Sequence, residues 1–341
     1  MRARPLASCL LALLLAAVAP GATAASRRRI TDDGFVLAGQ SNMLGASTQF
    51  ENLTLGRVTS PAPNGISSWA FRARGDNAWT LANEFPCDDS QCNGTACVYP
   101  GPNRTVEQHP QWTDHGAGTC VCSCGVHIPS DRTDSDAHRG SAWPTFAALW
   151  MERQRRAYLV ASAMGGECLV GSYSPTQPAW DPNAMDCSTM EPISYGDEAP
   201  TPQHPGEFYC RMVEAVATSR VPHLRAVLWY QGECDASMKV ARSDYESALE
   251  RLADAVWRDL GVPMIVAPIS RKTRTDDACE SSPAIDAIHA ATVDAAAAHP
   301  HIFLGPNTDD LPLESDCVHI HDVMTLGQRW YQAVLDAGVA P

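Results

Sequence analysis

The sequence predicts an α/β fold in which a central parallel sheet of about five strands lies between two layers of helices. Two observations predict it: short apolar runs that stop at glycine, proline or polar residues, and helical patterns between those runs. Short continuous apolar runs are typical of strands buried on both faces. Strands that alternate with helices form parallel sheets covered on both sides. A cysteine-rich segment at about 86–130 interrupts the alternation, and we expect it to be a loop insertion.

The predicted strands are five apolar runs. The first stops at Gly39, and each of the others ends near a glycine, a proline or a polar cluster, as strands in such folds do. In chain order the runs are Phe35 to Ala38, Tyr158 to Ala163, Ala226 to Tyr230, Met264 to Ala267 and Ile302 to Leu304.

Two helices are predicted from apolar residues that recur on one helix face. The first carries Tyr245, Leu249, Leu252 and Val256, and the second carries Leu326, Trp330, Val334 and Ala337. Because helices that connect parallel strands cover the sheet, we expect these apolar faces to pack against it.

Polar residues directly follow two of the predicted strands. Ser41 lies just past the first strand, and the segment Gln231–Glu233 follows the third. In open parallel sheets, ligands bind beyond the carboxyl ends of the strands. The functional site is therefore expected at this edge of the sheet.

The first 25 residues have the pattern of a secretory signal peptide. Arg2 and Arg4 precede an apolar run from Leu10 to Val18, and small residues follow, so cleavage is expected near Ala25. The apolar run is shorter than the ~20 residues of a membrane span. We therefore expect a secreted, soluble protein without membrane insertion, in which residues 26–341 form a single domain.

The cysteine count fits an oxidising compartment. Of the 13 cysteines, Cys9 lies in the signal peptide, which leaves an even number, 12, for disulfide bonds. The insertion has little apolar material for a core, so disulfides are expected to staple it. Its cysteines are Cys87, Cys92, Cys97, Cys120, Cys122 and Cys124. Sequons at Asn52, Asn93 and Asn103 predict a glycoprotein with glycans on surface loops.

The charge of the chain limits its partners. The formal net charge is -14 at pH 7, and cleavage of the signal peptide takes it to -16 because Arg2 and Arg4 leave. Nucleic acids and anionic membranes bind surfaces rich in Lys and Arg. We therefore expect neither as a partner, and a neutral substrate fits better.

A serine, a histidine and an acid form the main chemical signal. A serine hydroxyl becomes a nucleophile when a base removes its proton, and a third group must hold that base in the right tautomer. Asp316 precedes His319 by three residues, close enough on a turn to accept the Nδ1 proton, and the other nitrogen is then free to face Ser41. The predicted catalytic residues are therefore Ser41, Asp316 and His319.

Three short motifs carry a family resemblance. Gly39–Met43 reads GQSNM, Trp229–Glu233 reads WYQGE, and the Asp316 and His319 pair follows in that order. Together they resemble the sialate O-acetylesterase and acetylxylan esterase group, carbohydrate esterase family six, within the SGNH hydrolases. The resemblance covers about Phe35 to Leu335 and omits the insertion. It implies a flavodoxin-like three-layer α/β/α sandwich and a serine esterase that removes O-acetyl groups from carbohydrate, such as sialic acid or xylan, with no metal or other cofactor.

The resemblance also implies an oxyanion hole. It assigns two backbone N–H donors, those of Ser41 and Gly140, and we choose the side chain of Gln231 as the third. We place Glu233 behind the site, because a carboxylate aimed at an oxyanion would oppose the charge that develops there. The residues expected to support the site are Gln40, Asn42 and Glu233.

The residues alone leave other readings of the site open. Asp322, next to His321, is an alternative acid, and the spacing of His319 and His321 also suits a metal. The cysteines at 120, 122 and 124 with nearby histidines suit zinc, although an oxidising compartment favours disulfides. One possible pairing, Cys234 with Cys317, would tie two of the motifs together at the site.

Two other functions are compatible with the chain. An esterase of lipids or small acyl esters would need a wide apolar groove. Neither the cysteine-rich insertion nor a second expected loop insertion, Ser174 to Pro205, which is rich in Pro, Ser and Asp, suggests one. A secreted glycan-binding or matrix protein would use the cysteine-rich segment on a hydrolase scaffold. The presence of Ser41, Asp316 and His319 together argues against a binding or matrix protein, because a site that no longer catalyses a reaction has no physical reason to keep all three residue types.

Overall fold

The computed structural model describes residues 31–44, 69–72, 79–81, 141–153, 155–172, 178–189, 204–272, 279 and 281–339. The predicted signal peptide, the cysteine-rich insertion, the three sequons and Gly140 lie outside the described residues.

All five predicted strands are present and parallel. They are β1 (Thr31–Gly39), β4 (Arg155–Ala161), β5 (Leu224–Tyr230), β6 (Met264–Ala267) and β7 (Ile302–Leu304). Their spatial order is β4-β1-β5-β6-β7. Numbered along the chain, this is the 2-1-3-4-5 order of flavodoxin-like folds, so that expectation is confirmed. Neighbouring strands are added on opposite sides of β1 and β5, and open α/β sheets bind their ligands at the carboxyl ends of the strands where this reversal occurs.

Two further strands extend the sheet beyond β4. They are β2 (Trp69–Arg72), which is parallel to β4, and β3 (Trp79–Leu81), which is antiparallel to β2. Among the described residues the sheet therefore has seven strands, where the sequence predicted about five. At four and three residues, these edge strands are too short to show a continuous apolar run or a clear alternation, which are the signals that predict strands.

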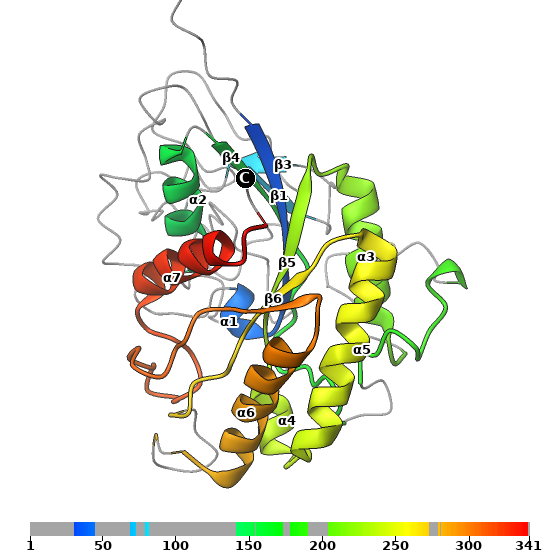
Figure 1. Cartoon of the computed structure of the whole chain (residues 1–341), viewed down its shortest axis with the longest axis vertical. Helices are drawn as coiled ribbons and strands as arrows, with labels where there is room; N and C mark the ends of the chain where they lie inside the picture. Colours follow the sequence, from blue (N-terminus) through cyan, green and yellow to red (C-terminus); the bar gives the residue numbers. More distant parts are fainter. Residues whose placement is uncertain are drawn as a thin grey trace, which may run out of the picture.

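The helices cover both faces of the sheet. In chain order they are α1 (Ser41–Leu44), α2 (Trp143–Glu152), the 3-10 helix η4 (Cys187–Thr189), α3 (Glu207–Ser219), α4 (Glu233–Ser237), α5 (Arg242–Leu260), α6 (Pro283–Ala298) and α7 (Val323–Asp336). Figure 1 shows α2 and α7 packed together on one face and α3, α5 and α6 on the other. Within the described part of the chain, none of these helices is long and apolar enough to cross a membrane.

The two helices predicted from apolar periodicity are α5 and α7. All four predicted apolar residues of α5, from Tyr245 to Val256, are buried. In α7 the predicted residues Leu326, Trp330 and Val334 are buried, and Ala337 lies just past the last helical residue. The periodic stripe therefore identified the buried face of each helix.

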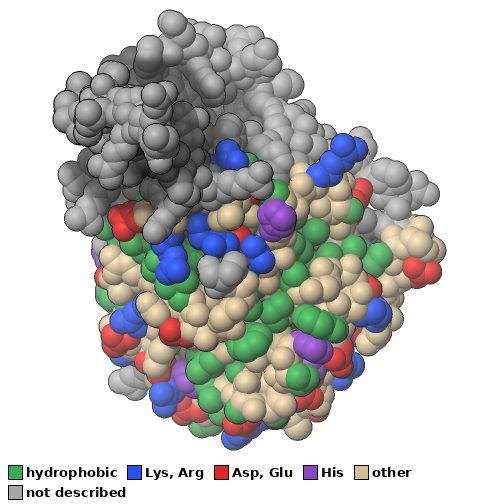
Figure 2. Space-filling model, turned by 45° about the horizontal axis from the view of Figure 1, so that its top comes forward, with side chains coloured by type: hydrophobic (Ala, Val, Ile, Leu, Met, Phe, Trp, Pro, Cys, Tyr) green, Lys and Arg blue, Asp and Glu red, His purple; other side chains and the backbone are tan. Residues whose placement is uncertain are grey.

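A buried acid ties three strands together at the amino edge of the sheet. Asp33 of β1 is fully buried and accepts hydrogen bonds from Arg155, Arg225 and the indole of Trp150, at distances from 2.5 to 3.0 Å. Burial raises the pKa of Asp33, but these donors outweigh it, so the pKa stays below its usual value. Figure 2 turns this edge toward the viewer and shows Lys and Arg side chains gathered there.

Candidate active site

The end of β1 delivers Ser41 to the carboxyl edge of the sheet. The N–H of Gln40 donates to the carbonyl of Tyr230 at 2.9 Å, so β1 stays paired to β5 up to its last residue. Gly39 has φ +115°, and a Cβ there would lie 2.3 Å from the carbonyl oxygen of Tyr230. Only glycine allows this approach. The chain then turns into α1, whose first residue is Ser41.

Ser41, His319 and Asp316 form a chain of hydrogen bonds. Nε2 of His319 lies 2.9 Å from Oγ of Ser41, and Nδ1 lies 2.5 Å from Oδ2 of Asp316. Because an ionised carboxylate only accepts, Nδ1 carries the proton, and Nε2 presents its lone pair to the serine hydroxyl. This is the arrangement of a nucleophile, its base and the group that orients the base.

The local backbone keeps Asp316 ionised. Its Oδ1 accepts the N–H groups of Val318 at 2.9 Å and His319 at 3.0 Å. Partial burial raises the pKa of Asp316, whereas these N–H groups and the His319 ring lower it, and the net effect is a pKa below the usual value. Asp316 is therefore charged at neutral pH.

The alternative acid, Asp322, is engaged elsewhere. It caps α7, accepting from the backbone N–H of Thr325 at 3.0 Å and from its hydroxyl at 2.6 Å. His321 lies 3.1 Å from Glu314, through Nδ1 and Oε1. Among the described residues, no three His, Cys, Asp or Glu side chains gather as metal ligands would.

Gln231 faces the protein interior. Its Nε2 donates to Oδ2 of Asp235 at 2.6 Å and to the carbonyl of Glu167 at 3.1 Å, and the side chain is fully buried. An amide has two N–H donors, so both are engaged in this structure. The hydroxyl of Tyr245 also donates to the backbone carbonyl oxygen of Gln231 at 2.7 Å. As an oxyanion donor, Gln231 would have to exchange one of these bonds.

Asp235 is the residue that the sequence analysis missed. It is fully buried, and its carboxylate accepts the N–H groups of Leu169, Val170 and Gly171 at 2.7 to 2.8 Å, in addition to Gln231. These bonds attach the loop after β4 to α4. The sequence shows an acidic residue four positions after Gln231, but nothing in it indicates which loop that carboxylate binds.

Asn42 and Glu233 form a buried pair behind the nucleophile. Nδ2 of Asn42 donates to Oε1 of Glu233 at 3.0 Å. Burial raises the pKa of Glu233 to about 7, against the lowering effect of this hydrogen bond. Gln40, the remaining supporting residue, is also buried. Glu233 thus contacts a neighbour of Ser41 rather than the hydroxyl.

The possible disulfide between Cys234 and Cys317 is wrong. Cys234 pairs with Cys168 in the loop after β4, and Cys317 pairs with Cys279 in the segment before α6. The two loops do lie at the same edge of the sheet, but each cysteine meets a different neighbouring loop. Spacing in the sequence cannot order such pairings.

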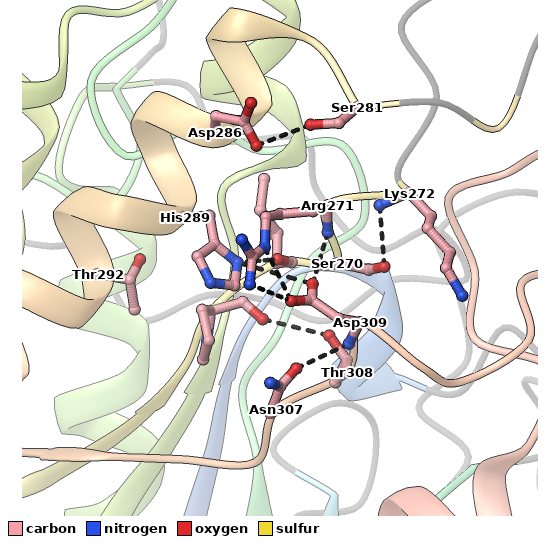
Figure 3. Close-up of polar contacts among 12 residues, drawn as sticks. Ser270, Arg271, Lys272, Ser281, Asp286, His289, Thr292, Asn307, Thr308 and Asp309 are labelled. Carbon is pink, nitrogen blue, oxygen red and sulfur yellow. Dashed lines mark hydrogen bonds and ion pairs between the residues drawn. The ribbon is translucent and has the colours of Figure 1, made fainter.

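Polar contacts join the loops that follow β6 and β7 beside the site (Figure 3). Arg271 donates to Asp309 from its backbone N–H at 2.9 Å and from Nε at 2.8 Å. The hydroxyl of Thr308 donates to the carbonyl of Pro268 at 3.3 Å, and His289 of α6 contacts the carbonyl of Ile269 at 2.8 Å. Asp316 follows Asp309 by seven residues, so this network anchors the chain shortly before the acid and histidine turn.

Three solved structures of low sequence identity are similar to this chain, and the two with TM-scores above 0.5 share its fold. A protein from Arabidopsis thaliana has a TM-score of 0.54 and 20% identity, covering 89% of this chain and 98% of its own. NanS has a TM-score of 0.53 and 14% identity, covering 90% and 98%. A carbohydrate acetylesterase from Xanthomonas citri has a TM-score of 0.48 and 15% identity, covering 89% and 55%. No curated protein sequence matches the chain.

A family comparison goes further than the fold. The sequence profile described as carbohydrate esterase, sialic acid-specific acetylesterase matches residues 140–336, which is more than half of the chain. The match includes Gln231, Glu233, Asp316 and His319, whereas Ser41 precedes it. The predicted resemblance is thus confirmed, and the chain belongs to the sialic acid-specific acetylesterase family of carbohydrate esterases.

Proposed function

We propose that this protein is a secreted carbohydrate O-acetylesterase that works through an acetyl-serine intermediate. The observation that carries the proposal is the continuous contact from Asp316 through His319 to Ser41, with heavy-atom distances of 2.5 and 2.9 Å. Both distances lie within hydrogen-bonding range without any movement of the protein. The family membership supplies the substrate class.

The reaction has two acyl transfers. Oγ of Ser41 attacks the acetyl carbonyl carbon while Nε2 of His319 takes the hydroxyl proton. The tetrahedral intermediate collapses, the bond to the sugar oxygen breaks, and His319 returns the proton to that oxygen. A water then attacks the acetyl-serine and gives its proton to Nε2. Acetate leaves, and Ser41 recovers the proton. Asp316 stabilises the imidazolium in both halves.

The proposed oxyanion hole combines three donors. The N–H of Ser41 begins α1, where helix geometry provides no internal partner. Gly140 is the second proposed donor. For Gln231 we propose that the bond to the Glu167 carbonyl, the longer of its two at 3.1 Å, is exchanged for the oxyanion, while Asp235 keeps the amide in place. One such donor is worth about 3 kcal/mol of transition-state stabilisation.

Secretion is supported by the cysteines. Three disulfides join described residues, including one between Cys187 of η4 and Cys210 of α3. Disulfides of this kind persist in oxidising compartments. They agree with the signal peptide predicted from the sequence, and together they support an extracellular or secretory-pathway location.

The test is acetate release by the secreted chain and by its Ser41→Ala variant. Three substrates are compared: an aryl acetate, acetylated xylan and O-acetylated sialic acid. We expect release that vanishes in the variant while thermal unfolding shows that both proteins are folded. The preferred polymer then names the substrate. If folded wild-type protein releases no acetate from any of the three, the proposed function is wrong.

A further inference from the structure

Asn42, the residue after the nucleophile, contacts the histidine segment at two backbone groups. Its Oδ1 accepts the N–H of Ile320 at 3.0 Å, and its Nδ2 donates to the carbonyl of Val318 at 3.2 Å. These groups belong to the peptide bonds on either side of His319. One side chain therefore holds both ends of the residue whose imidazole must face Ser41.

The other bonds of the histidine segment serve a different purpose. The carboxylate of Asp316 accepts two N–H groups of the same turn, and the Cys279–Cys317 disulfide ties the turn to the segment before α6. These bonds shape the turn and anchor it to a neighbouring loop, but they do not link it directly to the segment that carries the nucleophile. The bonds of Asn42 do, because Asn42 is adjacent to the nucleophile in the chain and lies in the same short helix.

Glu233 sets which way the Asn42 amide faces. Its Oε1 accepts from Nδ2 at 3.0 Å, and both side chains are buried, at 6% exposure for Asn42 and 7% for Glu233. An amide rotated by half a turn would present its oxygen to two acceptors, the Glu233 carboxylate and the Val318 carbonyl. Burial makes such a mismatch costly because water cannot replace the lost donors.

We infer that Asn42 is a positioning residue, oriented by Glu233, that keeps His319 within hydrogen-bonding distance of Ser41. The inference rests on the proposed esterase reaction. Asn42 acts through His319 and not on the substrate, so its loss lowers kcat and leaves KM nearly unchanged. A displacement of about 1 Å at a catalytic group costs on the order of 100-fold in rate.

The first test compares Asn42→Ala with Tyr209→Phe on an aryl acetate. Tyr209→Phe removes a hydrogen bond to Asp259, between α3 and α5, and controls for a general loss of stability. We expect kcat to fall on the order of 100-fold in Asn42→Ala, with KM within roughly twofold of the wild type. The control variant should keep both constants, and thermal unfolding is measured for each protein.

A second test exchanges donor and acceptor in the Asn42 and Glu233 pair. Asn42→Asp keeps an acceptor for the Ile320 N–H but places two carboxylates in contact. Adding Glu233→Gln restores a donor to the pair, because the amide at position 233 can now donate to the carboxylate at position 42. With all four proteins of the cycle measured, we expect the double variant to regain about tenfold in kcat over Asn42→Asp. A role for Asn42 that does not depend on its contact with Glu233 would give no such rescue.

A crystal structure of Asn42→Ala gives a readout independent of activity. We expect the distance from Nε2 of His319 to Oγ of Ser41 to rise from 2.9 Å to beyond about 3.5 Å, outside hydrogen-bonding range. A retained 2.9 Å contact, or an unchanged kcat in an active enzyme, would overturn the inference. If the wild type releases no acetate, the proposed function fails, and this distance still decides whether Asn42 positions His319.

Discussion

The buried acid Glu233 predicts a specific dependence of stability on pH. Burial raises the pKa of Glu233 from an ordinary 4.5 to about 7 in the folded protein. Below pH 4.5 the group is protonated in both the folded and the unfolded chain. As the pH rises toward 7, the unfolded chain releases this proton while the folded protein retains it, so the free energy of unfolding falls. Above pH 7 the loss is complete.

The size of this loss follows from the shift. Because a tenfold change in proton affinity corresponds to about 1.4 kcal/mol, a pKa raised from 4.5 to about 7 lowers the free energy of unfolding by about 3 kcal/mol at pH 8. In Glu233→Gln the group cannot titrate, and its Oε1 can still accept from Asn42. The introduced N–H lies where Oε2 has no hydrogen-bond partner among the described residues. Burying this unpaired N–H lowers the stability of the variant by the same amount at every pH, so it does not change how the free energy of unfolding depends on pH.

The assay is urea unfolding of wild type and Glu233→Gln, followed by tryptophan fluorescence at several values between pH 5 and 8. Linear extrapolation gives the free energy of unfolding of each protein. We expect the variant to gain about 2.5 kcal/mol relative to wild type between pH 5 and 8, because part of the effect is already present at pH 5, with most of the gain complete by pH 7.5. Because other titrating groups are common to both proteins, they cancel in the difference. Parallel curves would refute the argument that burial raises the pKa of Glu233.

Further predictions concern the turn, its disulfide and the loop after β4. Asp316→Asn should lower kcat by about 10,000-fold, because His319 is then no longer held in the tautomer that accepts the serine proton. Asp322→Ala should cost about 1 kcal/mol of stability through the lost α7 cap and leave kcat unchanged. Equal losses of kcat in the two variants would contradict the assignment of Asp316 as the acid. Replacing both Cys279 and Cys317 by serine should lower stability by about 4 kcal/mol for a loop of 38 residues. It should also lower kcat, whereas loss of the disulfide between η4 and α3 should affect stability alone; retained kcat in both would show that the first disulfide does not hold the turn. Asp235→Asn should cost at least about 2 kcal/mol, because the three N–H groups that it holds lose a charged acceptor, and hydrogen exchange in residues 169–171 should rise; unchanged exchange there would contradict this role.

The sequence predicted those features that depend on local pattern. The run Phe35 to Ala38 and the apolar stripe of α5 correspond to single elements, whose burial is visible in one stretch of chain. The acid and histidine turn is also local, because Asp316 and His319 are three residues apart and contact each other within one turn.

Features that join distant segments were not predictable in the same way. Asp235 accepts from residues 64 to 66 positions earlier, and no pattern in either segment names the other. The partner of Cys317 likewise depended on which of several loops at the carboxyl edge lies closest. Gln231 was correctly placed at this edge, but the direction of its amide is set by Asp235. Polar partners of this kind depend on tertiary structure, not on residue type.

The charge cluster around Asp33 has a consequence for how the molecule opens. It locks β1, β4 and β5 together at the amino edge, at the opposite end of these strands from the loops that carry Ser41 and His319. Local opening of a folded protein starts where few buried bonds must break. The carboxyl-edge loops are joined to one another by their disulfides and by Asp235, and none of these bonds involves Asp33. We therefore expect these loops to open without breaking the bonds of Asp33, while the backbone amides of the strands remain protected from hydrogen exchange. Loop opening around a substrate and unfolding of the sheet are thus expected as two separate events, with separate free energies.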